Sequence, residues 1–462
     1  MELAKELITA VQRNNSHAGY GLQKECEALV SHVLSNMVKT KMPPLDSDAK
    51  NEEDSARFRE EGNQSFVSGD DDEAIEKYTM SLAYAPSRGS MALALANRSA
   101  ALYRKKLYRE CLIDIDAALV HGYPPDKQRK LKDRAQKAVE AVRQLYRPKD
   151  LNMNDLPATG DPNQEPIEGD LAMIRKFIDD RAAPEACATD DLDELMSKGR
   201  KGPARYIVEE RELSFAHGPS EEAPALSKGV RIAYSQKYGR YLEATEEFQP
   251  GDIVAMEKPY AYVVYREKYY THCHHCLERS YNLIPCPACP VAQYCSEKCK
   301  TRDWELAHGT ECPILAVLSK LLKLDKDKIR ILTKIIRLLI IATKNGTAID
   351  EVRRDAEIAE KNPDNRTAGF TDDGKFLGHE TRCALSLSTN LDTRPLMEVS
   401  AFACISALAA VLLAVVTKFF GKKYEMDELR EAVEKDDVKF CGTLIFRNCV
   451  IVSSNSYSVG MV

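Results

Sequence analysis

The sequence predicts a mainly α fold with a small β domain. Three patterns predict this class. Small residues recur at helical spacings in residues 51–147, polar and apolar residues alternate in residues 228–272, and helical periodicity returns after Pro313. Seven of the 14 cysteines lie in residues 273–312, so a cysteine-rich module separates the alternating stretch from the second helical stretch.

Length and charge limit the possible functions. The 462 residues suffice for about two to four domains. The 65 basic and 71 acidic residues give a formal net charge of −6, so nucleic-acid binding is not indicated and no overall charge favours anionic lipid. The first residues, MELAKELITAVQRNN, lack the apolar core of a secretory signal. We therefore expect a cytoplasmic and nuclear protein.

The most apolar run is AFACISALAAVLLAVVTKFF, residues 401–420. Its uninterrupted part, residues 401–416, is shorter than the roughly 20 residues that span a bilayer. We therefore expect a buried core helix and no membrane partner. The alternative is a short membrane span flanked by Lys418, Lys422 and Lys423.

A helical N-terminal lead is expected in residues 1–50, and repeated helical pairs in residues 51–147. The second copy, NRSAALYRKKLYRECLIDIDAALVHGYP, has Cys111 where the first has Ala74, and a third, incomplete unit follows. The alternative is a set of amphipathic helices without a repeat. The spacings of a tetratricopeptide repeat are matched in the first copy by Gly62, Phe66, Gly69, Ala74, Tyr78, Leu82 and Pro86.

The remaining segments are assigned from composition and periodicity. Residues 148–227 predict a linker and helical connection, because they begin with a stretch rich in Pro, Asp and Asn. Residues 228–272 predict strands of the small β domain, and residues 313–440 predict helices. Residues 441–462 are helical or extended, and their apolar run GTLIFRNCVIV predicts an exposed apolar surface.

Eight soft ligands occur as close pairs in the cysteine-rich module. Thiolates or imidazoles two to four residues apart can hold one ion from a tight turn, so four pairs predict two structural zinc ions with no open coordination position. Free buried cysteines are the alternative, and His272, His274 and His275 are expected at the surface. The predicted ligands are Cys273, Cys276, Cys286, Cys289, Cys295, Cys299, His308 and Cys312.

The order of these ligands, with YCSEKC and DWELAH around the single tryptophan, resembles the MYND finger. The resemblance implies interleaved sites. One would use Cys273, Cys276, Cys295 and Cys299, and the other would use Cys286, Cys289, His308 and Cys312. It also implies that the finger binds a protein substrate or proline-rich peptide partners.

The sequences GRYLEAT and PGDIVAMEKPY before the finger resemble the first SET part of the SET and MYND lysine methyltransferases, and the repeats resemble the fourth member of that family. The resemblance implies a split SET β-fold in residues 228–272 and 441–462, with the finger and a helical insertion between the parts. It implies methyl transfer from S-adenosylmethionine to a protein lysine. Cofactor contacts are implied for Lys237, Gly239, Arg240 and Asn455.

No catalytic residue is assigned. The NHxC segment, catalytic tyrosine and late zinc-binding cysteines of that family do not occur before Val462, so we expect an incomplete SET domain in this chain. The alternative function is a non-catalytic adaptor, with the finger on a proline-rich partner and the repeats on a peptide or chaperone tail. Candidates for a carboxylate clamp, unless they are solvated helix faces, are Asn97, Arg98, Lys105 and Arg109.

Overall fold

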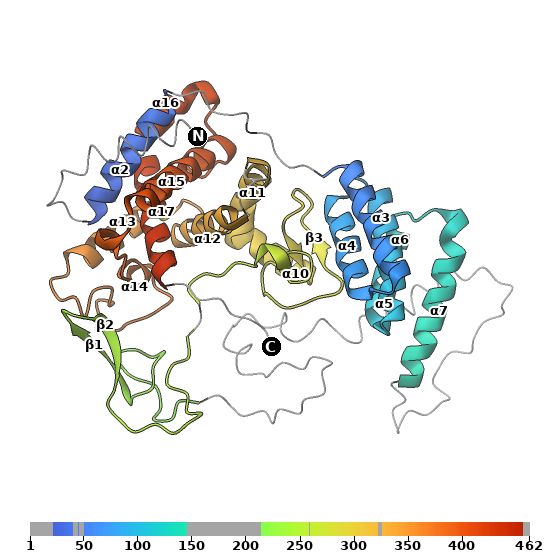
Figure 1. Cartoon of the computed structure of the whole chain (residues 1–462), viewed down its shortest axis with the longest axis horizontal. Helices are drawn as coiled ribbons and strands as arrows, with labels where there is room; N and C mark the ends of the chain where they lie inside the picture. Colours follow the sequence, from blue (N-terminus) through green and yellow to red (C-terminus); the bar gives the residue numbers. More distant parts are fainter. Residues whose placement is uncertain are drawn as a thin grey trace. The chain divides into compact units, whose positions relative to one another are not determined.

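The computed structural model describes residues 22–39, 45, 50–145, 214–257, 259–321 and 326–455. In these residues the fold is mainly helical, with a few short strands (Figure 1). The start of the expected lead and most of the expected linker lie outside the described residues. The chain divides into two compact units, which are treated separately here: one includes residues 50–145 and 264–303, and the other includes α2, residues 214–263 and residues 304–455.

The first unit contains consecutive helices that each pack against the next. Short polar side chains begin them: Asn51 accepts a hydrogen bond from the Asp54 amide, and Asp70 accepts one from the Glu73 amide. Gly69, with φ of 94°, ends the first helix in the left-handed conformation. The elements are α3 (Glu52–Ser68), α4 (Asp71–Tyr84), α5 (Arg88–Arg104), α6 (Tyr108–Val120), η1 (Pro125–Lys127) and α7 (Gln128–Leu145).

The helices α3 and α4 approach closely at Gly62. A Cβ atom at this position would lie 2.6 Å from Cε1 of Tyr78. The Tyr78 hydroxyl donates a hydrogen bond to Oδ1 of Asn63 at 3.0 Å. The ring is therefore buried against the bare backbone of Gly62 while its polar end keeps a partner.

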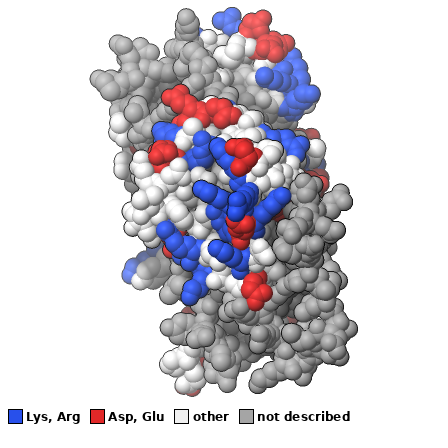
Figure 2. All heavy atoms as spheres, turned by 90° about the vertical axis from the view of Figure 1, so that its right-hand side faces the viewer, with Lys and Arg blue, Asp and Glu red and all other residues white. Residues whose placement is uncertain are grey.

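One side of this unit, formed by α7 and η1, is basic. The helix α7, at the right of Figure 1, has exposed Arg129, Lys130, Lys132 and Lys137, and the exposed Lys127 precedes it in η1. Figure 2 faces this side and shows lysine and arginine gathered there, with fewer acidic side chains among them. The net negative charge of the chain is thus unevenly distributed.

The second unit is a helical core around α15 and α17, which pack against each other and against α2. At Gly442 a Cβ atom would lie 2.9 Å from Cγ1 of Val30 and 3.4 Å from Cβ of Ala410, so the three helices meet closely at this glycine. The elements are α2 (Leu22–Met37), α11 (Gly309–Leu321), α12 (Lys326–Ala342), α13 (Ile349–Lys361), α14 (Thr381–Leu385), η6 (Leu391–Thr393), α15 (Leu396–Val416), η7 (Met426–Glu428), α16 (Leu429–Glu434) and α17 (Asp436–Asn455).

The structure corrects the interpretation of the last apolar run. Residues 442–451 are all buried within α17, so the predicted exposed apolar surface is wrong. The physical reason is that α2 and α15 cover this helix. The helix begins at Asp436, and the domain boundary placed between residues 440 and 441 falls inside it.

The helix α15 is the one helix in the described ranges that is long and apolar enough to cross a membrane. It has 21 residues because it begins at Leu396, so the argument that the segment is too short to span a bilayer is wrong. Its most apolar window has a mean hydropathy of 2.6 and is 72% buried inside the protein. That burial is typical of the core helix that the sequence predicts.

The β part of this unit is smaller than expected. The strands β1 (Val230–Ser235) and β2 (Gly239–Ala244) form an antiparallel hairpin, with Ser235 opposite Gly239 at the turn. The following segment forms only single bridges, such as Leu226 with Ala255, although strands were expected there. Alternation alone did not reveal that these residues lack a continuous partner strand.

Candidate metal centre and its surroundings

The cysteine-rich module is built from tight turns and short elements: β3 (Ile284–Pro285), β4 (Gln293–Tyr294), α10 (Glu297–Asp303) and η5 (Trp304–His308), which continues into α11. The boundary between the two units falls between Asp303 and Trp304, inside this continuous helical segment. In the first turn the amide of Leu277 donates to the carbonyl of Cys273 at 3.0 Å, and Leu277 has φ of 63°. This turn brings Cys273 and Cys276 together.

Two groups of four possible ligands form in this module. In each group the ligand atoms lie within 4.8 Å of one another. The Sγ atom of Cys295 lies 3.6 Å from Sγ of Cys276 and 3.5 Å from Sγ of Cys299. The first quartet is Cys273, Cys276, Cys295 and Cys299, and the second quartet is Cys286, Cys289, His308 and Cys312.

The chemistry of both quartets fits zinc. Four thiolates, or three thiolates and one imidazole, complete a tetrahedral zinc site and leave no position for water or substrate. The second quartet is buried throughout. Hydrogen bonds from Cys276, Cys295 and Cys299 hold the pKa of the Cys273 thiol far below its ordinary value, and thiolate is the form that binds zinc. These are the same groupings that the MYND resemblance implies.

The structure places the three additional histidines differently from the sequence prediction. His274 is 3% exposed, so its assignment to the surface is wrong, whereas His272 and His275 are half-buried. His274 packs edge-on against the rings of Tyr269 and Tyr294. It also belongs to a third possible metal group with His308 and Glu311. Because that group contains no thiolate and shares His308, we interpret it as the surroundings of the second quartet.

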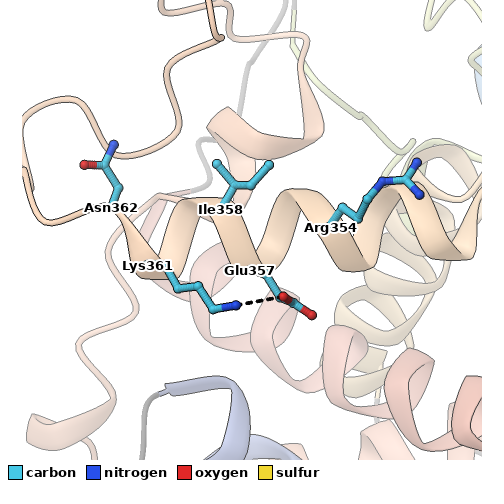
Figure 3. Close-up of a pocket in the computed structure, with 5 residues that line it drawn as sticks. All are labelled: Arg354, Glu357, Ile358, Lys361 and Asn362. Carbon is cyan, nitrogen blue, oxygen red and sulfur yellow. Dashed lines mark hydrogen bonds and ion pairs between the residues drawn. The ribbon is translucent and has the colours of Figure 1, made fainter.

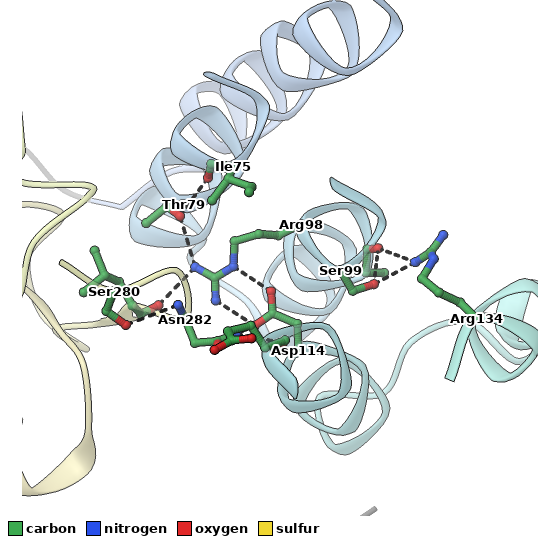
Figure 4. A network of polar contacts seen from close by, with 11 residues as sticks. Ile75, Thr79, Arg98, Ser99, Asp114, Arg134, Ser280 and Asn282 are labelled. Carbon is green, nitrogen blue, oxygen red and sulfur yellow. Dashed lines mark hydrogen bonds and ion pairs between the residues drawn. The ribbon is translucent and has the colours of Figure 1, made fainter. Parts of the chain in front are cut away.

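A buried ion pair lies where the module meets α5 and α6, within the first unit (Figure 4). Arg98 donates to both carboxylate oxygens of Asp114, at 2.6 and 2.8 Å, and the two side chains are 2% and 1% exposed. Arg98 also donates to Oγ1 of Thr79 at 3.1 Å and to the main-chain carbonyl of Leu283 at 3.2 Å. One side chain thus joins three helices to the module.

Asn282 completes the same network from the module's side. Its side-chain amide donates to Oδ1 of Asp114 at 2.8 Å and to the carbonyl of Glu110 at 2.9 Å. At the edge of the contact, Arg279 and Asp72 form an ion pair at 3.3 Å. Residues 279–283 are therefore docked on the helices through buried polar contacts and not through exposed charge alone.

This network contradicts the assignment of Arg98 to a carboxylate clamp or to a solvated face, because the side chain is buried and paired with Asp114. The other clamp candidates also have local partners. Asn97 donates to Oδ1 of Asn63 at 2.9 Å, and Lys105 pairs with Asp72 at 2.7 Å. Charge patterning could not reveal these pairings, because it does not show which helix faces are covered.

The predicted cofactor contacts lie around the β1–β2 turn and the end of α17. Gly239 has φ of 68°, a conformation that favours glycine, and Lys237 is exposed, with Nζ 4.7 Å from the centre of the Tyr238 ring. Arg240 instead donates to the carbonyls of Ala368 and Ser386, and burial lowers the pKa of its guanidinium. The guanidinium thus connects β2 both to the loop after α13, at Ala368, and to the end of α14, at Ser386.

Asn455, at the end of α17, contacts the loop that follows α14. Its side-chain amide donates to the carbonyl of Ser388 at 2.9 Å and to that of Ile451 at 2.8 Å. Arg240 and Asn455 therefore hold Ser386 and Ser388, which are two residues apart. The sequence analysis did not identify this loop, because no motif marks it. The four cofactor contacts stay predictions.

A shallow hollow on α13 offers no competing site. It is lined by side chains from the end of one helix (Figure 3). Two of its charged side chains, Lys361 and Glu357, already form an ion pair with each other at 2.9 Å. No further polar groups converge on it from other elements among its lining residues. These are Arg354, Glu357, Ile358, Lys361 and Asn362.

Comparison with known protein families identifies the cysteine-rich module. Residues 273–312, which contain both quartets, match the family model of the MYND finger. The module is therefore a MYND finger, and its two quartets fit zinc binding. No solved structure shows a significant match to the chain.

The curated relatives extend the similarity beyond the finger. Protein-lysine N-methyltransferase SMYD4 of Homo sapiens is 28% identical over 331 residues, 65% of this chain and 38% of its own length. The protein of that name from Pongo abelii is 28% identical over 290 residues, 56% of this chain and 34% of its own length. Histone-lysine N-methyltransferase Smyd1 of Mus musculus is 33% identical over 124 residues, 27% of this chain and 24% of its own length.

These matches show that the chain is similar to the SET and MYND protein-lysine methyltransferases. The matched part spans about a third of the length of the first of these relatives.

Proposed function

We propose that this chain acts in S-adenosylmethionine-dependent methylation of protein lysines, with the finger and the preceding helices holding a protein partner. The observation that supports the proposal most strongly is the similarity to SMYD4 proteins over more than half of the chain. The finger itself has no open metal position, so it acts as a binding and structural module.

Two finer assignments belong to this proposal. The helices α3 to α6 are tetratricopeptide repeats, which is supported by the close approach at Gly62 and by the consecutive packing of the helices. The β1–β2 hairpin belongs to a split SET fold, which is supported by its position directly before the finger. The convergence of Arg240 and Asn455 on one loop is consistent with a cofactor site there.

The test is calorimetric titration of S-adenosylmethionine into the full, zinc-loaded chain. We expect saturable binding that weakens about tenfold or more in Lys237→Ala and Asn455→Ala. Lys228→Ala removes another exposed lysine near β1 and serves as the matched control. Arg240 is left intact because its guanidinium holds the loop at Ser386.

A folded, zinc-loaded chain that does not bind S-adenosylmethionine would contradict cofactor binding by this chain. The non-catalytic adaptor would then be the better account of its function. In that case a proline-rich peptide should bind the finger with the same affinity whether or not Lys237 is replaced.

A further inference from the structure

A buried ion pair lies next to the single histidine of the second quartet. Glu311 on α11 and Arg337 on α12 have side chains only 1% and 2% exposed, and Nη1 of Arg337 lies 2.8 Å from Oε2 of Glu311. The same carboxylate oxygen lies 3.9 Å from Nδ1 of His308. The imidazole thus presents Nδ1 to Glu311, which leaves Nε2 for an ion held with Cys286, Cys289 and Cys312.

Stability alone does not explain this pair. A buried ion pair is often no more stabilising than apolar residues of similar volume. A histidine that binds metal through one ring nitrogen, however, commonly donates the other N–H to a carboxylate, which fixes its tautomer and orientation. Glu311 lies on the Nδ1 side of the His308 ring, 3.9 Å from that nitrogen, where such a carboxylate is needed.

The Glu311 carboxylate can accept a further hydrogen bond. In the part of the chain that the structure describes, Oε1 of Glu311 is buried without a hydrogen bond, whereas Oε2 accepts from Arg337. Arg337 holds the carboxylate in place from α12, whose residues Leu332, Ile336 and Ile340 lie in the core of the second unit. A continuous connection therefore runs from the metal ligand to the helical core.

We propose that Glu311 and Arg337 are positioning residues for His308 and that they couple zinc binding in the second quartet to the packing of α12. The inference rests on zinc binding at this quartet. It assigns to two residues outside the ligand set a role in the affinity and geometry of one of the two ions.

The test uses the full chain loaded with ¹¹³Cd. The first quartet offers four thiolates and the second offers three thiolates and an imidazole, so the two ions give separate resonances. We expect Glu311→Gln to shift the resonance of the second ion and to lower its affinity, measured by chelator competition, by about 10- to 100-fold. The first ion should keep its resonance. Glu305→Gln, an exposed glutamate of η5, is the matched control and should change neither.

A purely structural ion pair would behave differently. Glu311→Gln would then change thermal stability while leaving the resonance and the affinity of the second ion as in the unaltered protein, and this result would overturn the proposal. If Glu311→Gln does not fold, Glu311→Gln combined with Arg337→Met leaves no unpaired charge and is measured in its place, with the same two outcomes. An unaltered chain that shows the resonance of the four-thiolate site but none from the second quartet would instead refute metal binding at the second quartet.

Discussion

Arg98 and Asp114 bury two opposite charges where the helices hold the finger. Both oxygens of Asp114 accept hydrogen bonds from Arg98, and one of them also accepts from Asn282. Such a network is stable only while each partner is present, because an unpaired charge in a buried position is costly. The docking of the finger therefore depends on single residues of α5 and α6.

Asp114→Ala should destabilise the first unit by about 3–5 kcal/mol, since it leaves the guanidinium of Arg98 buried without its carboxylate. Hydrogen exchange followed by mass spectrometry should show lost protection in α5, α6 and residues 279–285. Asp133→Ala removes an exposed aspartate of α7 and should leave the exchange unchanged. Equal protection in the two variants would show that the pair does not hold the finger.

Gly62→Ala should cost about 1–3 kcal/mol of unfolding free energy, because the new Cβ meets the ring of Tyr78 at 2.6 Å. Gly89→Ala is the control, since its Cβ finds only Oγ of Ser87, at 3.9 Å, and alanine favours the helix. Thermal unfolding of both variants measures the difference. A Gly62→Ala protein as stable as Gly89→Ala would contradict close packing of α3 and α4.

The residues of the finger could be predicted because each ligand pair is local in the sequence. Cys299, for example, lies in the first turn of α10, and Cys295 lies just before that helix. The contact of Asn282 with Asp114 could not be predicted, because it joins residues 168 positions apart. The burial of Arg98 was missed for the same reason: the part of the finger that covers it is distant in sequence.

At the scale of elements, α2 closes the core of the second unit. Val30 and Leu34 are buried against the cluster formed by α15 and α17. A segment near the start of the chain thus packs against its last described helices. Periodicity predicted helical structure here, but it did not reveal that α2 belongs to the core of a distant segment.

Leu34→Ala should destabilise the second unit by about 2–5 kcal/mol, through lost apolar burial and the cavity that remains. Leu34 is 1% exposed, so water does not fill the space that the smaller side chain leaves. Glu27→Ala, on the exposed face of the same helix, is the control. Urea denaturation followed by circular dichroism checks both variants, and an unchanged midpoint for Leu34→Ala would mean that α2 is not part of this core.

The apolar helices show the limit of sequence patterns at this scale. In α17 apolar residues occur on all sides, so periodicity could not distinguish helix from strand, and burial by α2 and α15 decides the outcome. In α15 the composition predicts a helix but cannot distinguish a core helix from a membrane span. Its burial inside the protein supplies that distinction.

At the scale of the whole molecule, the finger is continuous along the chain with both compact units. Residues 264–303 belong to the first unit, and its last ligands, His308 and Cys312, lie in the second. Zinc ions held by the two quartets would stabilise the finger, because structural zinc contributes directly to folding free energy.

The most direct test of this account is the zinc content of the purified full chain, measured by mass spectrometry of the metal together with protein concentration. We predict two zinc ions per chain, one in Cys276→Ser and one in Cys289→Ser, because each substitution removes a ligand from a different quartet. Cys404→Ser, a cysteine of α15 outside both quartets, should retain two. One ion in the unaltered chain, or two in either ligand variant, would contradict the interleaved pair of zinc sites.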